Sequence, residues 1–157
     1  MTNKLCRKCD SIKPLTDFHK TAKNKDGHYC YCKVCSIRCA NNRGLKKRDT
    51  LDGYIKYLTS SNKSSSKKRK IEYSLKPDTI KDLYTKQEGN CAVTQEPMTF
   101  GRKPSLTNIS IDRIDNTKGY VINNVQLVCH IINTMKWTMD LKELKIWCGK
   151  ILNGRED

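Results

Sequence analysis

The sequence predicts an α+β fold in two parts: a small cysteine-rich module at the N-terminus, and a longer core of two short strands with flanking helices. Cysteine pairs separated by two residues define the first part. In the second part, Ile109 and Ile111 alternate with polar residues as in a half-buried strand, and amphipathic stretches lie on both sides. We expect the module over 1–40, a basic helix and linker over 41–76, and the core with a C-terminal helix over 77–157.

The positive charge is concentrated in the N-terminal part of the chain. The protein has 157 residues and a net charge of +15. Residues 1–70 hold 19 Lys/Arg against 5 Asp/Glu, a net of +14, whereas residues 71–157 are nearly neutral. Phosphate contacts with counterion release supply most non-specific affinity for nucleic acid, so this asymmetry favours a polyanionic partner.

The cysteine content indicates where the protein works. The chain has nine cysteines, a polar N-terminus and no apolar run long enough to span a membrane. Without an export signal, thiols are expected to be reduced and available to bind metal. We therefore expect an intracellular protein, cytoplasmic or nuclear, with no membrane partner.

The N-terminal module contains two Cys-x2-Cys pairs, Cys6 with Cys9 and Cys32 with Cys35. Each such turn can place two thiolates on one ion, and two turns complete a tetrahedral structural Zn²⁺ site. A set of Cys30, Cys32, Cys35 and Cys39 is the alternative. We prefer the two pairs because their geometry matches. Zn²⁺ is expected to fold the module, which has few apolar residues.

The middle of the chain predicts a helix followed by a linker. Asn41–Arg48 is basic and expected to run into a helix that Thr50 caps, with an apolar stripe at Leu51, Tyr54, Ile55 and Leu58. Ser60–Ser66 is interpreted as a linker because it is rich in serine. The basic run that follows, and the basic residues of the loop 98–108, are candidate DNA contacts: Lys67, Lys68, Arg69, Lys70, Arg102 and Lys103. For the run 67–70, nuclear targeting is the alternative in a eukaryotic host.

Two further helices are expected around the core. One runs from about Pro77 to Glu88 and stops at Gly89. The other begins at a capping-box pattern formed by Asp140 and Glu143. Its apolar residues should cover the core, and we expect packing rather than base stacking from the tryptophan among them: Leu141, Leu144, Trp147, Cys148 and Ile151.

The segment 110–136 carries the chemistry. A strand is expected to end at Asp112, a turn to follow over 116–119, and a second strand to cover 120–122. Asn123 or Asn124 would then cap a helix whose apolar stripe is Val125, Val128, Ile131, Ile132 and Met135. Folding this helix back over the hairpin would bring Asn133 near Asp112. One carboxylate and one amide oxygen suit a hard divalent ion that also takes waters and phosphate oxygens.

These residues resemble the ββα-metal core of the HNH (His-Me finger) endonucleases, in the PacI-like form where the usual Asp-His reads Asp-Arg. The resemblance covers Cys91 to about Lys136, and the N-terminal cysteine module resembles the four-cysteine zinc finger of the same proteins. It implies that Asp112 and Asn133 are the metal ligands and that Asn124 braces the loop. It also implies that Arg113 stands in the place of the general-base histidine.

The arginine changes the expected proton transfer. A guanidinium stays protonated, so Arg113 can hold a phosphate but cannot readily deprotonate water. His130, one helical turn before Asn133, is a candidate proton acceptor, and water or hydroxide on the metal is the alternative. Relatives of this core often hold another zinc with two cysteine pairs. Only Cys91 and Cys129 remain of those pairs, and we interpret them as small buried residues.

The sequence therefore predicts a metal-dependent endonuclease of double-stranded DNA, with structural Zn²⁺ and catalytic Mg²⁺ or Mn²⁺. The resemblance implies 5′-phosphate and 3′-hydroxyl products. Double-strand cutting would favour a homodimer. One alternative is a DNA-binding zinc protein with a degenerate, non-cleaving core, and a weaker one is an RNA-directed protein. The target and whether cutting is sequence-specific, as in restriction or homing, stay open.

Overall fold

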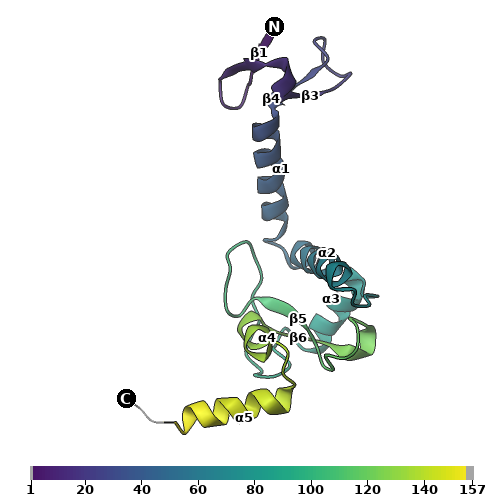
Figure 1. The fold of residues 1–157 in the computed structure, drawn as a ribbon, viewed down its shortest axis with the longest axis vertical. Coiled ribbons are helices and arrows are strands. Elements are labelled where there is room, and N and C mark those ends of the chain that lie inside the picture. The colour runs from purple at the N-terminus through teal and green to yellow at the C-terminus, as the bar shows by residue number, and fades with distance from the viewer. Residues whose placement is uncertain (1, 155–157) are drawn as a thin grey trace. The chain divides into compact units, whose positions relative to one another are not determined.

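The computed structural model describes residues 2–154, which form an α+β protein of two compact units that divide between Lys46 and Lys47 (Figure 1). In the described residues, the first unit contains two antiparallel two-stranded sheets and the second contains one, and each unit has at least one long helix. The α+β class predicted from the sequence is confirmed. No helix within the described residues is long and apolar enough to cross a membrane.

The first unit is built around its cysteines. Two hairpins, β1 with β2 and β3 with β4, precede the helix α1. Gly27, at φ +68°, lies in the turn of the second hairpin, where its carbonyl accepts from Thr21 N–H. From Thr2 to Lys46, the buried apolar residues are Cys6, Phe18, Cys32 and Cys35. The elements are β1 (Asn3–Leu5), β2 (Ile12–Pro14), a 3-10 turn (Leu15–Asp17), β3 (Phe18–Lys20), β4 (His28–Cys32) and α1 (Lys33–Lys47).

The second unit begins with two helices, α2 (Leu51–Arg69) and α3 (Pro77–Lys86). Thr50 caps α2 as predicted, because its side chain accepts from Gly53 N–H. The prediction of a linker at Ser60–Ser66 is wrong, since these residues continue α2. Serine is only a moderate helix former, and here tertiary packing and basic residues in the last turn support the helix.

A hairpin and a short helix follow: β5 (Ile109–Arg113), β6 (Val125–Cys129) and α4 (His130–Lys136). The strands pair antiparallel, with Asp112 opposite Gln126. The first strand was predicted correctly. The predicted position of the second strand, 120–122, is wrong. The predicted start of the helix at Asn123 or Asn124 is also wrong. Residues 125–129 form a strand, because a short apolar run with β-branched residues fits period 2 as well as period 3.6.

The core of the second unit lies between α2, α3 and one face of this hairpin. Fourteen buried apolar residues form it, among them Ile55, Ile80 and Leu127. Cys91 and Cys129 belong to this core, and Cys129 N–H donates to Cys91 Sγ over 3.3 Å. Burial raises the pKa of Cys129 to about 11, with the neighbouring Cys91 thiol adding to the effect. The interpretation of both as small buried residues is confirmed.

The last helix, α5 (Leu141–Leu152), starts at the predicted capping box. Asp140 accepts from Glu143 N–H at 2.8 Å, and Glu143 accepts from Asp140 N–H at 3.1 Å. Leu144 is the buried residue of this face, and no residue of α5 belongs to the described core of the second unit, so the prediction that the face covers the core is wrong. Trp147 is 54% exposed and Ile151 is 71% exposed, so the expected packing of Trp147 is wrong.

Candidate metal and catalytic sites

Four cysteines of the first unit converge on one point. The sulfur atoms of Cys6, Cys9, Cys32 and Cys35 all lie within 4.8 Å of one another. Cys6 and Cys9 come from the turn after β1, Cys32 ends β4, and Cys35 lies in the first turn of α1. Four thiols in such a cluster are compatible with a structural Zn²⁺ site. Among the described residues, this is the cluster the structure assembles, whereas Cys30 and Cys39 lie outside it.

The backbone around the cluster favours thiolates. Burial acts to raise the pKa of Cys6, but N–H groups of Cys32, Lys8 and Cys9 outweigh it and lower the pKa to about 6. Cys32 N–H, for example, donates to Cys6 Sγ over 3.2 Å. At Cys35, burial and the neighbouring thiols raise the pKa to about 12. A cation at the centre of the cluster would offset this repulsion between sulfur atoms.

In the second unit, Asp112 is a buried carboxylate near the end of β5. Its side chain is 4% exposed. Both oxygens accept hydrogen bonds from Lys136 Nζ, at 2.9 Å for Oδ1 and 3.1 Å for Oδ2, and Gln126 Nε2 donates to Oδ2 at 2.9 Å. Lys136 also donates to the Arg113 carbonyl. The acid is thus held in place by the next strand and by the last turn of α4.

Asn133 lies on the same face of the hairpin as Asp112. Its Nδ2 donates to Ser110 Oγ at 2.7 Å and to the Ile111 carbonyl at 3.3 Å. Ser110 and Asp112 are two positions apart on β5 and share a face, which α4 covers. The Asn133 amide is therefore anchored to the residue that precedes Asp112, although no hydrogen bond within the described residues joins the two side chains.

Asn124 holds the loop that leads from β5 to β6. Its Oδ1 accepts from Asp115 N–H at 2.9 Å, and its Nδ2 donates to the carbonyls of Asp115 and Gly119 at 2.9 and 3.0 Å. The side chain is buried. Gly119 packs so closely on Glu72 that an added Cβ would meet backbone at 2.7 Å. The three hydrogen bonds of Asn124 join the two ends of this loop.

Arg113 contacts the same loop. Its Nη1 donates to the carbonyls of Asn116 and Lys118 at 2.9 and 2.7 Å, and its guanidinium carbon lies 5.3 Å from the centre of the Tyr120 ring. One end of the guanidinium is therefore used to shape the loop. Because Arg has five N–H donors in all, the other N–H groups remain to bind an anion.

His130 is exposed at the start of α4. Together with Arg102 and Ser110 it lines a groove of about 340 Å³. Ser110 is also the partner of Asn133, so this groove adjoins the face that carries Asp112. Arg102 forms an ion pair with Asp49, with Nε 3.0 Å from Oδ1. Lys103 is exposed on the same loop and does not line this groove.

The basic run 67–70 lies at the end of α2. All four side chains are exposed, and Lys70 terminates the helix in the left-handed conformation at φ 57°. The Arg69 side chain lies against Tyr120 of the same unit, and its Nη2 donates to Tyr120 Oη at 3.3 Å.

Lys136 is the residue that sequence reasoning missed. It is 1% exposed and is the largest fully buried side chain among the described residues. A lysine in the last turn of a helix usually lies in water near the helix dipole, so its residue type gave no signal. Its spacing of three residues from Asn133 was the only clue, because that places both on one side of a helix.

No family model matches the chain, and no curated protein is similar enough to match. Among solved structures, the chain is similar to the rare-cutting HNH restriction endonuclease PacI, with 16% sequence identity and a TM-score of 0.43, over 94% of this chain and 92% of that one.

Proposed function

We propose that the chain is a metal-dependent endonuclease that hydrolyses phosphodiester bonds in double-stranded DNA. The observation that carries the proposal is a buried carboxylate, Asp112, on a hairpin face covered by a helix whose Asn133 side chain is anchored to the same strand. Such a sparse oxygen set suits a hard divalent ion that completes its shell with water and phosphate oxygens.

The donor set can accommodate that ion. A carboxylate has about four lone-pair sites, two on each oxygen. Lys136 uses one on each oxygen and Gln126 uses the second on Oδ2, so one site on Oδ1 is left for a metal. Asn133 donates through its nitrogen in both of its hydrogen bonds, which leaves its carbonyl oxygen as a ligand. Asp112 and Asn133 therefore each keep one oxygen available to Mg²⁺ or Mn²⁺.

Each residue of the site then has a separate role in the proposed reaction. When bound, the ion supplies Lewis-acid stabilisation of the charge that develops on the phosphate and on the leaving 3′ oxygen. Arg113 holds a phosphate oxygen through the N–H groups that its loop does not use. His130, exposed beside the groove, is the candidate acceptor for the proton of the attacking water. In-line attack gives 5′-phosphate and 3′-hydroxyl ends.

A plasmid digestion tests the proposal. Supercoiled DNA is incubated with the zinc-loaded protein, with and without Mg²⁺ or Mn²⁺, beside Asp112→Asn and Asn133→Ala. We expect nicked or linear DNA only with wild type and metal, and a loss of at least about 100-fold in both variants, the size of effect for a lost charge-stabilising group. Thr134→Ala, an exposed position on the same helix, is the matched control. Equal activity in all variants would refute these assignments.

The second candidate function is DNA binding without cleavage. The ion pair between Lys136 and Asp112 favours it, because the ammonium already neutralises the buried carboxylate without a metal. This function predicts salt-sensitive DNA binding that neither Mg²⁺ nor Mn²⁺ converts into cleavage. In both functions the exposed basic residues of α2 and of the loop 98–108 are proposed DNA contacts. A homodimer is expected if both strands are cut.

A further inference from the structure

One face of helix α1 carries an unusual stripe. Positions spaced by three and four residues fall on one side of a helix, and in most surface helices such a stripe is apolar and packs on a core. Here the stripe begins at a zinc-cluster cysteine and continues as basic and polar residues over three turns: Cys35, Arg38, Cys39, Asn42, Arg43 and Lys46.

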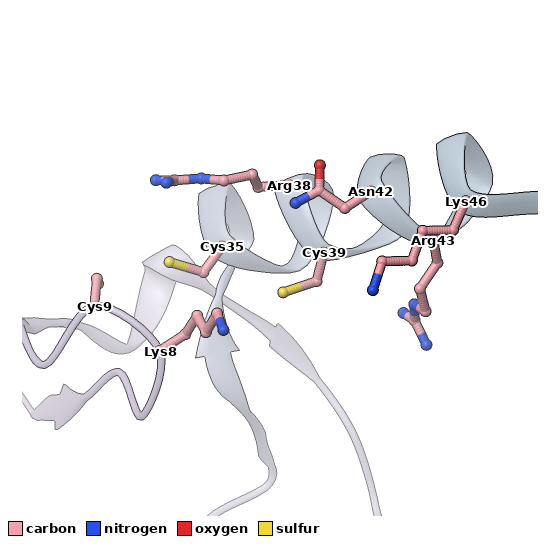
Figure 2. A pocket seen from close by; sticks show the side chains of 8 residues that line it. All are labelled: Lys8, Cys9, Cys35, Arg38, Cys39, Asn42, Arg43 and Lys46. Carbon is pink, nitrogen blue, oxygen red and sulfur yellow. The ribbon is translucent and has the colours of Figure 1, made fainter. Parts of the chain in front are cut away.

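This stripe forms one wall of a groove. Figure 2 shows its side chains along α1, with Lys8 and Cys9 approaching from the loop between β1 and β2. The groove has a volume of about 530 Å³, and all of its lining residues belong to the first unit. The distance along the helix axis from Arg38 to Lys46 is about 12 Å, at 1.5 Å per residue.

The charges in the groove are not neutralised. Four of its eight lining residues are basic, namely Lys8, Arg38, Arg43 and Lys46, and none is acidic. None of these four takes part in an ion pair within residues 2–154, whereas Lys4, Lys81 and Arg102 all do. The whole unit Met1–Lys46 carries 11 Lys/Arg against 3 Asp. Cations gathered without counter-charges create a local field that attracts an anion.

The groove depends on the cysteine cluster. Cys9 and Cys35 line it and also belong to the four-cysteine group, and Lys8 lies in the turn between Cys6 and Cys9. Gathering the four thiols therefore sets the loop of Lys8 against the first turns of α1. All eight residues that line the groove lie in a unit whose described buried core consists of Phe18 and three cysteines of the cluster.

We propose that this groove binds the phosphate backbone of duplex DNA. Arg38, Arg43 and Lys46 span about 12 Å along the helix, which is long enough for the three side chains to contact different phosphates of one strand. Asn42 adds an amide that can donate to a phosphate oxygen. Contacts of this kind position a protein on DNA and carry no sequence information. The choice of duplex DNA as the partner rests on the proposed function, whereas the inference that the groove binds phosphate rests on its charges alone.

Binding of a fluorescent DNA duplex by the full-length, zinc-loaded protein, without Mg²⁺ or Mn²⁺, tests the proposal. The test variant combines Arg38→Ala, Arg43→Ala and Lys46→Ala. The matched control combines Lys20→Ala, Lys23→Ala and Lys25→Ala, which removes three exposed charges of the same unit outside the groove. Alanine favours helix, so α1 should persist, and circular dichroism and zinc content verify it.

We expect the test variant to bind at least tenfold more weakly than the control variant. The slope of log K against log salt should become shallower by about 2.7, because each phosphate that the protein no longer neutralises removes about 0.9 from the slope. Equal loss in both variants would overturn the proposal, because net charge alone would then explain it. Tighter binding of single-stranded RNA of the same length, abolished in the test variant, would overturn the assignment to duplex DNA.

The outcomes separate this proposal from the proposed function. DNA binding that depends on the groove, with no cleavage in any metal, would refute the endonuclease and leave the groove intact. Metal-dependent cleavage with unchanged DNA binding in the test variant would support the endonuclease and refute the role of the groove.

Discussion

Lys136 places its ammonium nitrogen 2.9 Å from Oδ1 and 3.1 Å from Oδ2 of Asp112, with both side chains almost completely buried. The pair ties the last turn of α4 to the end of β5. The same nitrogen donates to the Arg113 carbonyl, so it also fixes the backbone beside the acid. A buried carboxylate needs such a partner, because an uncompensated charge in a low-dielectric interior is strongly destabilising.

We expect Lys136→Met to lower the free energy of unfolding by about 3–5 kcal/mol, the usual cost of removing one partner of a buried ion pair. Asp112→Asn together with Lys136→Met should recover part of the loss, because no charge then remains unpaired. Denaturant unfolding of the two single variants and the double variant gives the coupling energy.

Lys145→Met is the control, because Lys145 is exposed on α5 and should change stability by less than about 0.5 kcal/mol. If Asp112 can bind a divalent ion, saturating Mg²⁺ should raise the melting temperature of Lys136→Met more than that of wild type. Additive losses in the double variant would show that the two residues do not act as a pair.

Asn124→Ala should loosen the loop between β5 and β6. The substitution removes three hydrogen bonds and leaves the Gly119 carbonyl, at a buried position, without this donor. We expect a loss of about 1–3 kcal/mol in the free energy of unfolding. Asn123→Ala is the matched control, since this neighbour is exposed. Similar unfolding curves for the two variants would contradict the bracing role.

Asp115 gives the same loop a dependence on pH. Hydrogen bonds from the Thr117 hydroxyl and then the Thr117 N–H, with Lys118, lower the pKa of Asp115 to about 2. The folded pKa lies below the unfolded value of about 3.9, so the stabilisation is complete above the unfolded pKa and is lost as pH falls towards 2. Stability curves measured from pH 6 to 2 should be flatter for Asp115→Asn. Parallel stability curves for wild type and Asp115→Asn would rule out this contribution of Asp115.

The sequence predicted those parts of the fold that short-range chemistry determines. The cysteine pairs, the Thr50 cap and the Asp140–Glu143 capping box depend on residues close in the chain, and all were found. The strand Val125–Cys129 was taken for a helix, because its pairing with β5 is a long-range interaction that a local pattern cannot reveal.

The same limit applies to the candidate site. Asp112 and Asn133 could be selected from their residue types and their spacing. Lys136 could not, since its burial depends on a carboxylate 24 positions away. The exposed face of α5 was also missed, because an amphipathic pattern shows that a helix has an apolar side but not whether the same chain covers it.

Removal of zinc should unfold the first unit and spare the second. In the described part of Met1–Lys46, the buried apolar core consists of Phe18 and three cysteines of the four-cysteine cluster, so without an ion little apolar burial remains to offset the chain entropy. The second unit has its own larger core. With a chelator, we expect amide signals of the first unit to collapse in an NMR spectrum while those of the second persist. Loss of both would show that the units do not fold independently.

Zinc binding should also release protons. Burial and neighbouring thiols raise the pKa of Cys35 to about 12, so this group is protonated at neutral pH until the metal displaces its proton. Because thiolate is the ligand, zinc affinity falls as pH falls. It should fall more steeply below about pH 6, where Cys6, whose pKa is about 6, also becomes protonated. Calorimetry in buffers of different ionisation enthalpy measures the proton release. Cys39→Ser should leave the zinc affinity and the number of released protons unchanged. Loss of zinc in that variant would place Cys39 among the ligands.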